Sequence, residues 1–203
     1  VGAALGWTEN NLDYKNEDGV VDTKNHSFIA YSSYAYGDFS ADLQLGVSKG
    51  TYDIYRHINY DVAGQSTAIT SKGRTHGQQK FGRLQVQYAF YHKGFSVFPQ
   101  LKVDMSDSTV DAYSEINAGG FDVNLSQQNM SSSTLHVGVQ SQYAKNFSWG
   151  VLVPTLDIFW LGEVASDQDA IEGGFAFSPD NSQTFAITAE AEDTGFYLSP
   201  LHI

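Results

Sequence analysis

The stretch from Phe81 to Met105 decides the fold and reads FGRLQVQYAFYHKGFSVFPQLKVDM. Before its centre, apolar residues occupy every second position and alternate mainly with Arg and Gln. After its centre the alternation returns, with Ser, Gln, Lys and Asp between the apolar residues. Because a period of two is typical of strands, the pattern predicts two β-strands. The residues between them, His92-Lys93-Gly94, predict a tight hairpin, since Gly94 tolerates the positive φ that such turns need.

The direction in which each face of this hairpin points depends on the kind of protein. A soluble sandwich with an apolar core and a membrane barrel with a polar lumen show the same alternation. Each arm continues past ten residues, whereas globular strands are mostly about 5–6 residues long. Such arms suit tilted strands that cross about 25 Å of lipid. We therefore predict an all-β fold, an antiparallel up-and-down transmembrane β-barrel.

Further strands are predicted on both sides of the hairpin, for a total of about eight. The clearest are Val1–Trp7, Phe39–Ser48, Leu135–Gln140 and Leu152–Trp160. The stretch from Phe196 to Ile203 is typical of the beginning of a strand. Because Val1 starts within an apolar alternation, we expect residues 1–203 to be a single barrel domain that is truncated at both ends.

The predicted connections between strands alternate in length. Short turns are predicted at Gly37-Asp38, Lys93-Gly94 and Lys145-Asn146, and long loops near residues 10–25, 55–73, 107–131 and 163–195. In an up-and-down sheet this places all short turns at one rim, as in outer-membrane barrels. The aromatic residues are also predicted to form two bands, because both interfaces of a bilayer favour aromatic side chains. The band beside the short turns contains Tyr36, Phe39, Phe90, Phe95, Tyr143, Phe147 and Trp149, and the band toward the long loops contains Trp7, Tyr52 and Trp160.

The composition narrows the classes of protein. The net charge of -12 argues against nucleic acid as a partner, since phosphates are repelled by an acidic surface. No apolar run is long enough for a transmembrane helix. The absence of cysteine fits an exported bacterial protein, among many others.

No catalytic motif or cofactor site is predicted. Gly46–Gly50 matches G-x-S-x-G, but a nucleophile elbow needs a helix after the serine, and Ser48 lies within an uninterrupted strand pattern. The six histidines lack metal-ligand spacing. Asp53 with His57, or Asp107 with Asp111, imitates the acidic and histidine pairs of a barrel-borne protease, although acidic residues are also ordinary in solvated loops.

Four stretches occur in an order and spacing that resemble a known family. They are Val1–Trp7, Tyr52-Asp53 followed by Arg56, Val110–Glu115, and Gly150–Pro154. Together they resemble the translocator (β) domain of autotransporters, the type V secretion systems of Gram-negative bacteria. The resemblance covers essentially the whole chain.

The resemblance implies a twelve-stranded outer-membrane barrel that carries an N-terminal passenger to the cell surface. By that topology the chain lacks the linking helix and two strands at each end. The implied partners are outer-membrane lipid, the passenger with its linker helix in the pore, and the outer-membrane assembly machinery. Any enzymatic activity is expected in the missing passenger, and the barrel itself is not expected to be an enzyme.

Candidate lumen-lining residues follow from the polar positions of neighbouring strands. They are Asp42, Arg83, Lys102 and Asp104, whose opposite charges are placed to pair across the pore wall. The resemblance adds Glu115, which it implies lies near the outer half of the pore. Another kind of outer-membrane barrel, either a porin or a barrel-borne hydrolase, and a soluble β-rich binding protein remain the alternatives. A complete barrel of eight strands, which is a known closed size, is the alternative to a truncated one.

Overall fold

The computed structural model describes residues 1–14, 18–62, 64–177, 184–188 and 195–199. These residues contain no helix, and hence none that is long and apolar enough to cross a membrane. One large sheet follows the order of the chain, and all its neighbouring strands are antiparallel. Its wall strands are β1 (Gly2–Asp13), β2 (Gly19–Tyr36), β3 (Phe39–Val62), β4 (Gln65–Tyr88), β6 (Phe95–Val110), β9 (Gln128–Tyr143), β12 (Thr155–Gln168) and β15 (Gly195–Ser199). The short β5 (Phe90–His92) also belongs to this sheet and pairs with β6 beside the turn. The predicted all-β, up-and-down antiparallel architecture with eight wall strands is confirmed.

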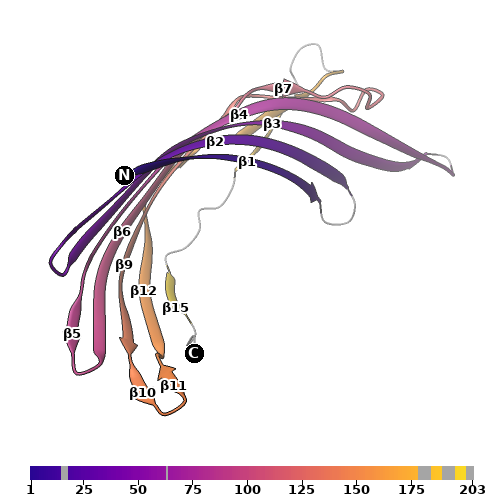
Figure 1. The fold of residues 1–203 in the computed structure, drawn as a ribbon. Coiled ribbons are helices and arrows are strands. Elements are labelled where there is room, and N and C mark those ends of the chain that lie inside the picture. Colours follow the sequence, from indigo (N-terminus) through magenta and orange to yellow (C-terminus); the bar gives the residue numbers. More distant parts are fainter. Residues whose placement is uncertain (15–17, 63, 178–183, 189–194, 200–203) are drawn as a thin grey trace.

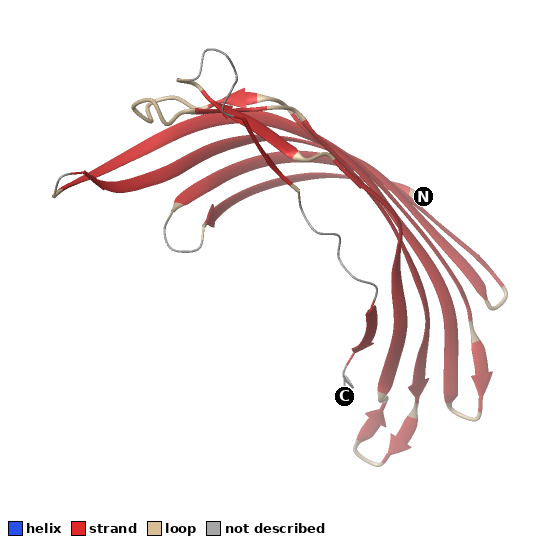
Figure 2. Ribbon diagram, turned by 180° about the vertical axis from the view of Figure 1, so that it is seen from behind, coloured by secondary structure: helices blue, strands red, loops and turns tan. Residues whose placement is uncertain are grey.

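The sheet is strongly curved along its strands and forms a trough (Figures 1 and 2). Within the described residues, β1 pairs only with β2, and β15 pairs only with β12. The described part of the wall is therefore open between these two strands.

A second sheet extends the wall beyond the first. It contains β7 (Tyr113–Ser114), β8 (Val123–Leu125), β13 (Ile171–Phe175) and β14 (Thr184–Ile187), in the order β14-β13-β8-β7. These strands directly follow or precede β6, β9, β12 and β15 along the chain, and their order in space is the same. Two backbone hydrogen bonds join neighbouring segments of the chain where one sheet passes into the other. Asp169 N–H donates to the Asn129 carbonyl, and Ser126 N–H donates to the Glu172 carbonyl.

The predicted long loops are largely wrong. Most of residues 10–25 and 55–73 belong to strands, and β3 and β4 run on to a turn between Val62 and Gln65. Where a sheet has water on both faces, strand pairing continues without the apolar alternation that reveals a strand in sequence. The end that was predicted to carry long loops therefore differs from the short-turn end mainly because its strands extend farther.

The short turns lie at the opposite end. Gly37 and Gly94 have φ values of 59° and 84°, as the hairpin prediction required, and Lys93 shares the left-handed region with a φ of 45°. The third turn was misplaced, because Lys145 and Asn146 form part of β10 (Lys145–Phe147), which pairs with β11 (Gly150–Leu152). The chain turns instead at residues 148 and 149.

The apolar face of the sheet is exposed. Register places Leu84 between Leu43 and Val103, and Leu101 between Val86 and Val137, so apolar side chains form continuous rows across strands. Leu84 and Leu101 remain 43% and 41% exposed. These side chains do not form a dry core, which agrees with a face that is covered by lipid.

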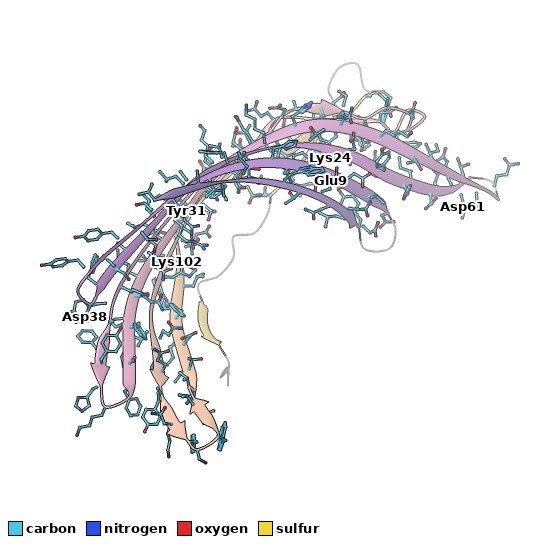
Figure 3. The ribbon with its side chains drawn as sticks, in the orientation of Figure 1. Glu9, Lys24, Tyr31, Asp38, Asp61 and Lys102 are labelled. Carbon is cyan, nitrogen blue, oxygen red and sulfur yellow. The ribbon has the colours of Figure 1, made fainter. Side chains whose placement is uncertain are left out.

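The polar face is the more shielded one. Only 25% of the Lys102 side chain and 16% of the His136 side chain are exposed. Side chains converge on the concave side of a curved sheet, so this difference indicates that the polar face lines the trough. Figure 3 shows Lys102 near the bend of the sheet.

Glycines and aromatic rings share the concave face. Phe81 is directly opposite Gly46, and Phe159 is directly opposite Gly138; each ring lies over its glycine. A Cβ on Gly138 would also be 2.5 Å from the carbonyl oxygen of Ile158. These pairs cover the bare glycine backbone and leave no room there for a larger residue.

Candidate functional site

Asp104 is the centre of a charged cluster on the concave face. Arg83 on β4 is directly opposite Asp104 on β6, and its Nε donates to Oδ1 at 2.5 Å. The Lys102 Nζ lies 3.5 Å from Asp104 Oδ2, and the His136 Nε2 lies 3.1 Å from the same oxygen. The structure thus brings together three of the residues predicted to line the lumen, in the cross-strand pairing expected of them.

The cluster carries excess positive charge, because one carboxylate faces both a guanidinium and an ammonium group. The Arg83 side chain is still 48% exposed, toward the hollow of the trough that Gln44, Phe81 and Thr134 also line. A guanidinium donates hydrogen bonds in a planar fork that suits carboxylates and other oxygen acceptors. Arg83 therefore offers hydrogen-bond donors to oxygen acceptors in the hollow of the trough.

Asp42 lies outside this cluster. In the register of the sheet, Gln85 on β4 separates Asp42 on β3 from Lys102 on β6. The Asp42 carboxylate accepts a hydrogen bond from the Ser33 hydroxyl at 2.5 Å instead. The structure keeps Asp42 on the concave face but does not pair it with a cation within the described residues.

Glu115 belongs to a second site, farther from the short turns. It forms a bidentate ion pair with Arg56, in which Arg56 Nε donates to Oε1 at 3.1 Å and Nη2 donates to Oε2. Arg56 Nη2 also donates to the Phe121 carbonyl at 2.9 Å, and the Glu115 carboxylate accepts from the Val123 N–H at 3.3 Å. The Glu115 side chain is 3% exposed, so the pair is almost closed to water on that side.

Small residues on β4 make this contact possible. Arg56 on β3 is opposite Ser71, and the bridge between Lys72 and Ile116 places Glu115 beside Gly73. Arg56 and Glu115 therefore meet across β4, over a fully buried Ser71 and a glycine. A Cβ on Gly73 would be 2.7 Å from the Tyr113 ring, so a larger residue would displace the segment above it.

The Arg56 guanidinium keeps its charge in this site. The hydrogen bonds that Arg56 donates to the Glu115 carboxylate raise the pKa of Arg56 against the opposing effect of burial. Burial, together with the nearby Glu115 carboxylate, raises the pKa of Tyr113 to about 12. The guanidinium therefore stays charged and the phenol stays neutral across the physiological range, and the site holds the chain in place without proton transfer.

Arg56 was not selected as a site residue from the sequence. It stands in one of the stretches that carry the family resemblance, and Glu115 stands in another. Periodicity gave no reason to connect them, because 59 positions separate them and both lie beyond the apolar part of their strands.

The other chemical candidates have ordinary structural partners. Ser48 lies within β3 and accepts a hydrogen bond from the Ser27 hydroxyl at 3.1 Å. Asp53 binds Arg74 through two hydrogen bonds of 2.7 and 3.0 Å, while the His57 Nδ1 lies 3.0 Å from the Thr70 hydroxyl. The described residues contain no group of three His, Asp or Glu side chains arranged to hold a metal ion.

Comparison with known proteins agrees with this geometry. A family model described as the autotransporter beta-domain matches residues 1–199. A search of curated proteins finds no match. The family match spans both charged sites, and it confirms the resemblance seen in the sequence.

Proposed function

Because this chain belongs to the autotransporter beta-domain family, we propose that its concave polar face lines the path by which a passenger polypeptide reaches the cell surface. The family acts as a translocator in the bacterial outer membrane, which places this chain there. The observation that supports the finer proposal is the charged cluster of Arg83, Lys102 and Asp104 on the face opposite the exposed apolar rows.

The proposed mechanism is physical. A polypeptide in transit carries peptide groups and charged side chains that lose hydration in a narrow pore. The exposed guanidinium of Arg83, with the neighbouring Lys102, offers donors to its carbonyl and carboxylate oxygens, while Asp42 and Asp104 offer acceptors. Glu115, held by Arg56, fixes the wall of the pore toward its outer end.

The functional unit in this proposal is a closed barrel. An unpaired edge of β1 or β15 in hydrocarbon would leave backbone groups unsatisfied, at several kcal/mol for each group. We propose that the eight wall strands form part of the twelve-stranded barrel that the family resemblance implies. The proposed partners are an N-terminal passenger, its linker helix inside the pore, and the outer-membrane assembly machinery. The barrel has no catalytic role in this proposal, and any enzymatic activity belongs to the passenger.

Reversing the charge of Arg83 tests the proposed path. Arg83→Glu places a second carboxylate directly opposite Asp104, so the concave face loses its excess positive charge. We expect a shift of the pore toward cation selectivity in planar bilayers and reduced display of the passenger on cells. Arg83→Lys should keep most of both properties.

Arg74→Glu is the matched control, because Arg74 also pairs with an aspartate on a neighbouring strand but lies on the opposite face. It should leave conductance and display unchanged. If Arg83→Glu alters conductance but not passenger display, a passive pore is the better interpretation. If neither conductance nor display changes, Arg83 is not a functional residue.

A further inference from the structure

The outward face of the sheet carries a pair of lysines, a pair of aromatic rings and an apolar hollow in one line along β6 and β9. We propose that this line, from Lys93 and Lys145 to the hollow beside Pro99, binds one anionic phospholipid of the inner leaflet. The proposal goes beyond passenger export. It rests on the outer-membrane location of the family and on the periplasmic position of short turns in such barrels.

Lys93 and Lys145 lie on neighbouring turns. The Ala144 N–H donates a hydrogen bond to the Gly94 carbonyl at 2.8 Å, and each lysine is the next residue toward its turn. Figure 1 shows the turn between β5 and β6 beside the hairpin of β10 and β11, at one end of the sheet. Both lysines are exposed. Their ammonium groups therefore have access to the same patch of headgroups.

No carboxylate of the same strands balances these two lysines. Residues 86 to 103 and 131 to 156 contain no Asp or Glu, although the whole chain has a net charge of -12. The other short turn contributes Asp38, which lies in the strand alternation of the concave face. Within the described residues neither Lys93 nor Lys145 takes part in an ion pair. This part of the outward face is therefore positive.

Aromatic rings mark the level at which headgroups begin. Phe95 is opposite Tyr143, and their ring centroids are 4.4 Å apart. On the other side of Lys145, its Nζ lies 5.3 Å from the centroid of the Phe147 ring. Aromatic rings favour the interface, where lysine side chains extend their charged ends into the headgroup layer. The two lysines thus lie on the water side of the Phe95–Tyr143 pair.

The hollow lies farther along the same strands, at an interruption of the sheet. Pairing of β4 with β6 ends at Gln87 and Gln100, and pairing of β5 with β6 ends at Phe90 and Val97. Pro99 lies within this interruption and has no N–H to donate to a neighbouring strand. The missing contacts leave a depression in the outward face.

The lining of the hollow is suited to an acyl chain. Tyr88, Leu101, Val139 and Trp160 contribute to it, all from the exposed apolar face, and no charged residue lines it. Its volume is about 670 Å³. Sites for small ligands have about 300–1,000 Å³, so the hollow is large enough for a ligand.

The depth of the hollow matches the length of a lipid. Pro99 lies six residues beyond Lys93, or about 20 Å along a strand. A strand tilt of about 45° reduces this to about 14 Å of depth, and one leaflet contributes about half of a hydrocarbon core of about 30 Å. A lipid whose phosphate contacts the lysines therefore has an acyl chain at the level of the hollow.

An anionic phospholipid fits this surface better than other phosphates do. The ammonium group of a zwitterionic headgroup would be repelled by the two lysines. A soluble phosphate would gain nothing from the hollow, and screening at physiological salt would weaken its attraction to exposed charges.

Native mass spectrometry of nanodiscs tests the proposal. The full chain is reconstituted in phosphatidylcholine that contains a small fraction of phosphatidylglycerol with the same acyl chains. We expect phosphatidylglycerol to be retained in preference to phosphatidylcholine. Lys93→Gln combined with Lys145→Gln should lower that preference about 10- to 30-fold, as expected for two lysines near an anionic headgroup. Val139→Phe, which fills part of the hollow without a change of charge, should also lower retention of phosphatidylglycerol.

The matched control is Lys49→Gln combined with Lys80→Gln. It removes two lysines from the same outward face but far from the short turns, so retention should stay unchanged. Equal retention of the two lipids by the unaltered protein would overturn the proposal. So would unchanged retention in the Lys93 and Lys145 double variant or in Val139→Phe, or displacement of the lipid by millimolar glycerol phosphate.

Discussion

Replacing Leu101 by arginine is expected to destabilise the folded protein in a bilayer by about 2–4 kcal/mol, the range found for arginine facing lipid near the midplane. Leu101 lies seven residues beyond Gly94 on an exposed apolar row, well within the length that crosses lipid. The guanidinium would have to leave water or drag water into the hydrocarbon. Urea unfolding in phospholipid vesicles, followed by tryptophan fluorescence, measures the change.

The neighbouring residue supplies the control. Gln100→Arg introduces the same side chain one position away, on the concave face, where water and polar groups surround it. Its effect on unfolding should be close to zero. Similar losses from both variants would mean that the two faces have similar surroundings, which is incompatible with lipid on only one of them.

Removing the carboxylate of Glu115 is expected to have the second large effect, confined to the outer part of the wall. Deleting one partner of a buried ion pair costs about 3–5 kcal/mol, and we expect about 2–3 kcal/mol here because 35% of the Arg56 side chain is exposed and solvent compensates part of its charge. Hydrogen exchange should report this change in Glu115→Ala. Protection of amides that hold the segment to β4 and β8, such as that of Ile116, should fall by about 30- to 150-fold.

Asp53→Ala is the matched control for this variant. It also breaks a bidentate pair with an arginine, but the pair lies on the outward face and the Arg74 side chain is 67% exposed. Exposed pairs contribute little, so protection of the same amides should hardly change. Equal losses in both variants would show that the burial of Glu115 has no special role.

The membrane-crossing part of the fold follows from the sequence because lipid on one side and water on the other impose strict alternation. Leu84, Val86, Leu101 and Val103 show this pattern, and the structure pairs them as adjacent rows. Beyond the lipid that constraint ends. The extension of β3 and β4 as far as Val62 and Gln65 was missed for this reason, and the same residues were assigned to a loop.

The charged cluster could be predicted only where it lies on regular strands. Arg83, Lys102 and Asp104 occupy alternate positions of their strands that face the same side of the sheet. Arg83 and Asp104 then meet because they are direct cross-strand neighbours. The contact between Arg56 and Glu115 depends on a bridge between Lys72 and Ile116 after an irregular stretch, and on the small Ser71 and Gly73 beneath it. No periodic pattern specifies that combination, so only the family resemblance pointed to those residues.

The central claim is that apolar side chains face lipid while polar ones face a wet trough, and spin labels on β6 test it most directly. The chain contains no cysteine, so single cysteines at positions 100 to 105 can each carry a label in bilayers. Labels at Leu101, Val103 and Met105 should collide mainly with dissolved oxygen, which concentrates in lipid. Labels at Gln100, Lys102 and Asp104 should collide mainly with a water-soluble nickel chelate. The claim would be contradicted if the labels at Leu101, Val103 and Met105 were shielded from both reagents. It would also be contradicted if these labels collided mainly with the nickel chelate and the other three mainly with oxygen.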